Sequence, residues 1–95
     1  MHRYELTFIV HPEVEEPDLT GILERVNSLI TDNGGEVVNQ TSWGTRRLAY
    51  PIQRMREGLY MFFEVKLPSE AIVEIERMLK LTEPIMRHLI VRVEE

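Results

Sequence analysis

Apolar and polar side chains alternate along the first residues of the chain. In RYELTFIVH, residues 3–11, one face carries Tyr4, Leu6, Phe8 and Val10, and the other carries Arg3, Glu5, Thr7 and His11. A period of two residues is typical of a strand with one buried face. Residues 3–11 are therefore predicted to form a half-buried strand that ends at Pro12.

Two later segments place apolar residues three and four positions apart, as on one face of a helix. In residues 15–35 this stripe consists of Leu19, Ile22, Leu23, Val26, Leu29 and Ile30. Pro17 and Asp18 suit its first turn, and Asn33-Gly34-Gly35 supplies a left-handed stop. A second helix is predicted to begin at Pro68-Ser69, with Ser69 as its N-cap, and to end at Glu83-Pro84.

Three further segments have the character of strands. The first, from Glu36 to about Leu48, is rich in Val and Thr, and a Pro-containing loop separates it from the second, GLYMFFEVKL at residues 58–67. The third closes the chain, where Leu89, Val91 and Val93 alternate with His88, Ile90, Arg92 and Glu94. The predicted order is strand, helix, strand, strand, helix, strand.

This order is the split βαβ arrangement of ferredoxin-like α+β domains. Right-handed crossovers then give a four-stranded antiparallel sheet of order 4-1-3-2 with two helices on one face. We expect one such domain over residues 1–95. The other face of the sheet is left open, and is expected to carry Arg3, Glu5, Thr7, Ile9, Tyr60, Phe62, Glu64, His88, Ile90 and Arg92.

The charge of the chain is unevenly distributed. The net charge is −5, yet Thr41 to Arg56 contains four arginines, two aromatic residues and no acid. A local basic segment permits a nucleic-acid partner in an acidic protein, and argues against indiscriminate binding. The chain contains no cysteine, which suits a reducing cytoplasm, and no apolar run that predicts a signal peptide or a membrane span.

Residue patterns for catalysis or metal binding are missing. The three histidines lack the spacing of metal ligands, and no GxxxxGK or GxGxxG motif occurs. An acylphosphatase-like enzyme would need a glycine-rich phosphate cradle after the first strand, where VHPEVEEPDL supplies acids instead. We therefore expect no enzymatic activity, no cofactor, no metal and no small-molecule substrate.

The basic segment has two interpretations. Its arginines could neutralise phosphates while Trp43 and Tyr50 stack on unpaired bases, a combination suited to irregular RNA. Arginines also protect edge strands from unwanted pairing, and the second strand is an edge in this topology. Alternation along the strand puts Arg46 and Arg47 on opposite faces, so the two are not expected to touch the same partner. EGLYMFFEV on the third strand is a partial match to the RNP1 motif of RNA-recognition modules.

Several motifs together resemble the bacterial small-subunit ribosomal protein six family. They are RYE at residues 3–5, GTRRLAYPI at residues 44–52, the aromatic third strand and RHLIVRV at residues 87–93. The resemblance implies a ferredoxin-like structural constituent of the small ribosomal subunit, located in the cytoplasm, that supports translation. It also implies binding to the central domain of 16S ribosomal RNA as a heterodimer with ribosomal protein eighteen.

Carried onto this chain, the family pattern gives candidate RNA-binding residues at Arg3, Tyr4, Arg46, Arg47, Tyr50, Arg54, Arg87 and Arg92. Tyr4 alternates with the core residues, so only its hydroxyl end is expected to reach RNA. An edge or open face of the sheet is expected to bind the protein partner through Trp43, Ile9, Tyr60, Phe62 and Ile90. The alternative function is a stand-alone ferredoxin-like module that binds a regulatory ligand or self-associates.

Overall fold

Four strands and two helices follow one another in the predicted order. The computed structural model describes residues 1–93, so the last two residues of the predicted domain, including Glu94 of the predicted last strand, lie outside the described part. The elements are β1 (His2–Val10), α1 (Glu16–Asp32), β2 (Glu36–Ile52), β3 (Met55–Leu67), a 3₁₀ turn η1 (Ser69–Ala71), α2 (Ile72–Leu81) and β4 (Ile85–Arg92). The strands form one sheet of order β2-β3-β1-β4 with antiparallel neighbours, which confirms the predicted topology.

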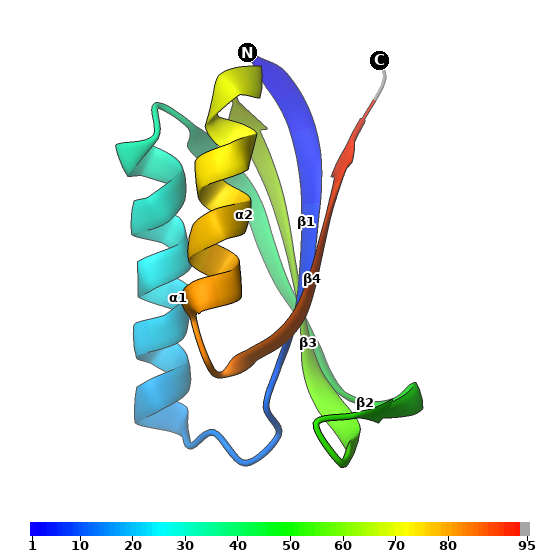
Figure 1. The fold of residues 1–95 in the computed structure, drawn as a ribbon. Coiled ribbons are helices and arrows are strands. Elements are labelled where there is room, and N and C mark those ends of the chain that lie inside the picture. Colours follow the sequence, from blue (N-terminus) through cyan, green and yellow to red (C-terminus); the bar gives the residue numbers. More distant parts are fainter. Residues whose placement is uncertain (94–95) are drawn as a thin grey trace.

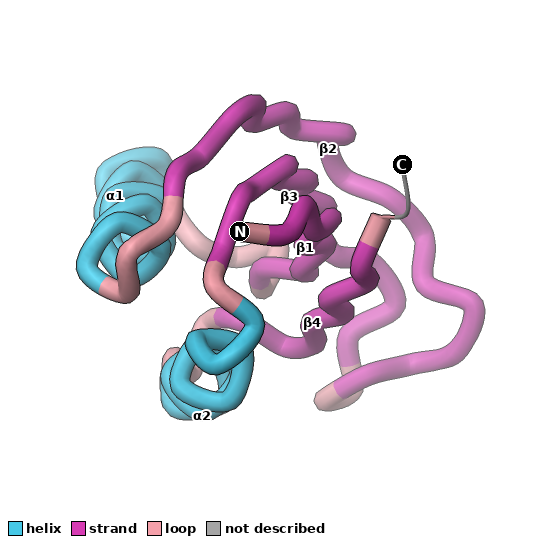
Figure 2. The backbone as a smooth tube through the Cα atoms, turned by 90° about the horizontal axis from the view of Figure 1, so that it is seen from above, coloured by secondary structure: helices cyan, strands magenta, loops and turns pink. Residues whose placement is uncertain are grey.

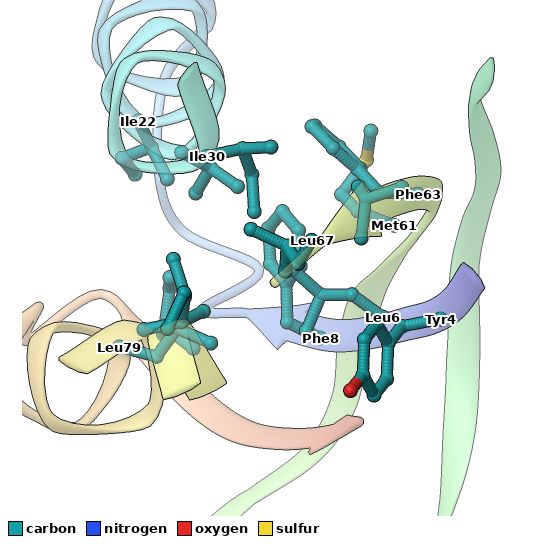
Figure 3. Close-up of a cluster of buried hydrophobic side chains, with 14 of the residues drawn as sticks. Tyr4, Leu6, Phe8, Ile22, Ile30, Met61, Phe63, Leu67 and Leu79 are labelled. Carbon is teal, nitrogen blue, oxygen red and sulfur yellow. The ribbon is translucent and has the colours of Figure 1, made fainter. Parts of the chain in front are cut away.

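Both helices cover the same face of the sheet, and the core lies between these two layers (Figure 1). Leu6 and Phe8 of β1 pair with Phe63 and Met61 of β3, and all four side chains are buried. The Phe8 and Phe63 rings are tilted, with centroids 5.4 Å apart. Ile22 and Ile30 of α1 and Leu79 of α2 meet these side chains from the helix layer (Figure 3). Among the described residues no helix has the length and apolar character needed to cross a membrane.

The predicted C-terminal stop of α1 is confirmed, and the predicted N-cap of α2 is not. The amide of Gly34 donates to Thr31 O (3.1 Å) and that of Gly35 donates to Ile30 O (2.9 Å). With Gly34 at φ 82°, this is a Schellman stop, as the glycine pair predicts. The prediction of Ser69 as an N-cap is wrong, because Ser69 lies inside the 3₁₀ turn and makes no side-chain cap bond.

The prediction of which β4 side chains lie on the open face of the sheet is also wrong. Leu6 pairs with Ile90 and Phe8 with His88, and cross-strand partners lie on the same face of a sheet. Ile90, His88 and Arg92 therefore lie on the helix side, and Leu89 and Val91 lie on the open face. Both faces of β4 are apolar, so alternation within the strand does not indicate which face meets the helices. The pairing of β4 with β1 determines which face of β4 meets the helices.

The basic segment forms a long β-hairpin, whose strands continue through most of residues 49–57, where a loop was predicted. β2 continues through Pro51 to Ile52, and Ile52 pairs with Met55 across the two-residue turn Gln53-Arg54. These two residues have φ values of 50° and 67°, as the central residues of a type I′ turn require. Pro51 is tolerated because β2 is an edge strand. We call residues 41–56 the basic hairpin.

The tip of the basic hairpin bends across the open face of the sheet. The pairing of β2 with β3 is interrupted between Arg47 and Ile52, so that residues 48–51 bulge away from the ladder. Seen from above, the hairpin curves from the β2 edge round to the side of β4 (Figure 2). Elements at opposite edges of the sheet thereby approach each other.

Candidate nucleic-acid interface

Positive charge gathers on the basic hairpin, away from the acidic helix α1. Its four arginines, Arg46, Arg47, Arg54 and Arg56, are all exposed. In contrast, α1 carries four acidic residues and one basic residue, Arg25. On α2, Arg77 donates two hydrogen bonds to Glu74 (2.8 and 2.9 Å), which lower the pKa of the Glu74 carboxyl below its ordinary value. A polyanion is thus attracted to the hairpin side of the molecule.

Tyr50 of β2 and Arg87 of β4 are in direct contact. The Arg87 guanidinium carbon lies 5.7 Å from the centroid of the Tyr50 ring, and Arg87 Nη1 donates a hydrogen bond to the Tyr50 hydroxyl. Both side chains are exposed, and both are candidate RNA-binding residues. The contact is possible because the bulge at residues 48–51 turns Tyr50 toward β4. The structure therefore brings together two predicted residues from opposite edges of the sheet.

Gly58 allows the bend of the hairpin. A Cβ atom at Gly58 would lie 2.3 Å from Ile9 Cγ2, 3.3 Å from Met86 Cε and 3.7 Å from Leu48 Cδ2. The side chains of Ile9 and Leu48 close over this position, and each is only 8% exposed. Leu48 thus fixes the base of the bend through apolar packing, while Tyr50 and Arg87 hold its outer side.

A pocket of about 280 Å³ remains between the bent hairpin and the sheet. Ile9, Leu48, Tyr60 and Leu89 give it an apolar lining, and Tyr50 and Arg87 also line it. Thr7 is another polar residue at its wall. The pocket marks the place where the basic hairpin adjoins the apolar open face.

Trp43 lies on the open face of the sheet, near the start of the basic hairpin. Its ring stacks on that of Phe62, with centroids 5.2 Å apart and an interplanar angle of 12°. Arg46 Nε donates to the carbonyl of Trp43 (3.1 Å). Arg46 pairs with Gly58 and Arg47 with Glu57, so the two arginines occupy opposite faces of the strand as predicted.

The remaining candidate RNA-binding residues lie at the other end of β1. Arg3 forms an ion pair with Glu64 (3.1 Å), and Arg92 Nη2 lies 2.7 Å from His2 Nδ1. Arg3 and Ile9 are six positions apart along β1, a separation of about 20 Å. Tyr4 is 6% exposed and packs in the core, so the structure assigns it to packing. The eight candidates do not form one surface.

The predicted protein-partner residues are only partly together. Trp43, Phe62, Tyr60 and Ile9 share the open face, whereas Ile90 packs against the core from the helix side. Sequence reasoning missed Leu89 and Val91, which are 61% and 45% exposed on the open face. Only the register with β1 could have identified them. Within residues 1–93, no group of three His, Asp or Glu residues is arranged to hold a metal ion.

Comparison with known proteins finds a matching protein family and similar solved structures. A family model described as Ribosomal protein S6 matches residues 3–92. The fold is also similar to the crystal structure of 30S ribosomal protein S6 from Thermotoga maritima, with a TM-score of 0.91 and 28% sequence identity. This match covers 97% of the present chain and 87% of the other.

Proposed function

Because the chain belongs to the ribosomal protein S6 family of the small ribosomal subunit, we propose that it binds the central domain of 16S ribosomal RNA together with ribosomal protein eighteen. In this role it is a non-enzymatic constituent of the ribosome in the cytoplasm, and it supports translation by stabilising a ribonucleoprotein surface. Its working partners are an RNA and a protein.

The observation that carries the proposal is the bent basic hairpin. Arg46, Arg47 and Arg54 project from an exposed hairpin whose base is fixed by Leu48 over Gly58. Because the hairpin backbone is already ordered, binding of its arginines to phosphates costs less conformational entropy, and each phosphate contact releases counterions. Arg87 extends this surface to β4, next to Tyr50. We assign these residues to the RNA side, where Arg46 and Arg47, on opposite faces of β2, would contact different parts of the RNA. Arg3 on the open face and Arg92 on the helix side are two separate, more distant candidate contacts.

The apolar open face is the proposed site for ribosomal protein eighteen. The exposed side chains of Leu89 and Val91 carry most of its accessible apolar surface, and the half-buried Tyr60 and Phe62 lie beside them, whereas Ile9 is largely covered by the hairpin. Apolar groups on a rim of charged residues are typical of a protein-interaction surface. The acidic helix α1 then faces away from the RNA.

Co-sedimentation tests the proposal. The protein should pellet with small ribosomal subunits prepared without their own ribosomal protein six, and it should remain bound through a moderate salt wash. Release at high salt is expected because phosphate contacts weaken as salt rises. A protein that stays in the supernatant at every salt concentration would favour the alternative, a stand-alone regulatory or ligand-binding module.

A further inference from the structure

Trp43, the single tryptophan of the chain, lies on the basic hairpin with its ring stacked on that of Phe62. We propose that the outer face of the Trp43 ring is a stacking platform for one unpaired RNA base, with Arg46 beside it for the adjacent phosphate. This inference rests on the proposed function and deepens it, because it identifies which part of the RNA the hairpin binds. The sequence allowed two roles for Trp43, base stacking and contact with the protein partner, and the inference favours the first.

The first support is the geometry of the stack. The Trp43 ring is nearly parallel to that of Phe62, at 12°, and 42% of Trp43 remains exposed. Phe62 is anchored in β3, between the pairings with Thr7 of β1 and Thr41 of β2. A flat ring that is supported on one side and open on the other can bind a base without rearranging. Stacking of this kind suits any base, because every base has a π-face.

The second support is the backbone that holds Trp43. The pairing of β2 with β3 shifts between Ser42 and Gly44, which leaves Trp43 as an extra residue in the strand. Gly44 has φ 76°, and its amide donates to Ser42 Oγ (3.2 Å). A bulge with glycine in the left-handed region re-aims the neighbouring side chain. Here the result is that Trp43 lies flat on Phe62.

The third support is charge. Arg46 Nε donates to the backbone carbonyl of Trp43, which holds the guanidinium at the same residue that carries the ring. Residues 41–56 contain four arginines and no acid. Bases presented by single-stranded RNA are accompanied by phosphates, and a stacking ring beside a guanidinium recognises both parts of a nucleotide. A base therefore fits this surface better than an apolar protein side chain, which gains nothing from the arginines.

Intrinsic fluorescence tests the inference because Trp43 is the sole tryptophan. The probe is a six-residue single-stranded oligoadenylate, compared with the same backbone lacking its bases. Oligoadenylate should quench the Trp43 emission, and the abasic probe should not. Affinity measured with a labelled probe should fall about 5- to 150-fold in Trp43→Leu, the range for losing one stacked base. Trp43→Phe should retain most of the affinity, and Val38→Ala, which also alters an exposed apolar residue of β2, should leave it unchanged.

Equal binding of oligoadenylate by Trp43→Leu and the parent protein, or binding without quenching, would overturn the inference. So would a blue shift of the emission on adding ribosomal protein eighteen without RNA, because it would mark Trp43 as a protein contact. Co-sedimentation separates the two proposals. If Trp43→Leu and the parent protein pellet equally with small subunits, the stacking platform is refuted and the ribosomal role stands.

Discussion

Tyr50 and Arg87 join the two edge strands of the sheet, although 37 positions separate them in the sequence. The guanidinium of Arg87 lies over the Tyr50 ring and also donates a hydrogen bond to its hydroxyl. Strands β2 and β4 are at opposite ends of the order β2-β3-β1-β4, so no backbone pairing joins them. The side-chain contact therefore holds the hairpin over the open face, and with it the arginines assigned to RNA.

A double-mutant cycle measures this contact. Tyr50→Phe removes the hydrogen bond and keeps the ring, and Arg87→Ala removes both interactions. We expect each single variant to lower the free energy of unfolding by about 0.5 to 1 kcal/mol, since both residues are exposed. The double variant should lose less than the sum. Urea denaturation checks the coupling, and strict additivity would show that the two side chains do not stabilise the hairpin together.

Variants of the turn residues Gln53 and Arg54 distinguish effects on protein stability from effects on RNA binding. Both residues adopt positive φ angles, which cost a non-glycine residue about 1 kcal/mol or more. Gln53→Gly and Arg54→Gly should therefore each raise the free energy of unfolding by about 0.5 to 1 kcal/mol, after allowing for the greater freedom of glycine in the unfolded chain. Thermal denaturation measures both.

RNA affinity should distinguish the two turn variants. Arg54→Gly removes a proposed phosphate contact and should weaken binding to the central-domain RNA, whereas Gln53→Gly should not. The two substitutions change neighbouring positions of the same turn, so each is the control for the other. Equal affinities would remove Arg54 from the RNA surface.

Gly58 is expected to tolerate no side chain. The Cβ of Gly58→Ala would lie 2.3 Å from Ile9 Cγ2, so Ile9 or the hairpin must shift. Overpacking of this kind costs about 1 to 3 kcal/mol. Gly21→Ala is the matched control, because nothing lies within 4 Å of its Cβ, and it should stabilise α1 by about 0.5 to 1 kcal/mol. Calorimetry that found both variants equally stable would contradict the packing of the hairpin on the sheet.

The sequence predicts the topology because β1 and the two helices each have one clearly apolar face, and because the order of the elements fits one fold. Leu6 and Phe8 of β1, and Ile22 and Ile30 of α1, could only be core residues, and the structure agrees. Strand β4 has apolar residues on both faces, so its orientation depends on the pairing of Leu6 with Ile90, a contact between distant segments. That information is not present in the strand itself.

The hairpin was harder to predict for a different reason. Pro51, and a turn without glycine or asparagine, indicate a loop by local propensity, yet packing of Leu48 over Gly58 and the Tyr50–Arg87 contact hold residues 48–52 in an extended hairpin. Tertiary contacts therefore outweigh local preference in this segment. The basic character of the segment was visible in the sequence, and its bend toward β4 was not.

The bend matters because it sets which arginines act together. Arg46, Arg47 and Arg54 lie on one hairpin, whereas Arg3 and Arg92 lie near the opposite end of β1, beside Glu64 and His2. We propose that the hairpin arginines, and not the positive charge of the chain in general, bind ribosomal RNA. Three basic residues on the helices, Arg25, Arg77 and Lys80, provide a matched control.

The most direct test is the salt dependence of binding to a 16S central-domain fragment, with ribosomal protein eighteen present. A variant with Arg46, Arg47 and Arg54 changed to alanine should bind about 1 to 3 kcal/mol more weakly, with a slope against log salt reduced by about 2 to 3. The control with Arg25, Arg77 and Lys80 changed to alanine should keep the parent affinity and slope. Equal losses in the two variants, or no loss in either, would show that the hairpin arginines do not form the RNA-binding surface.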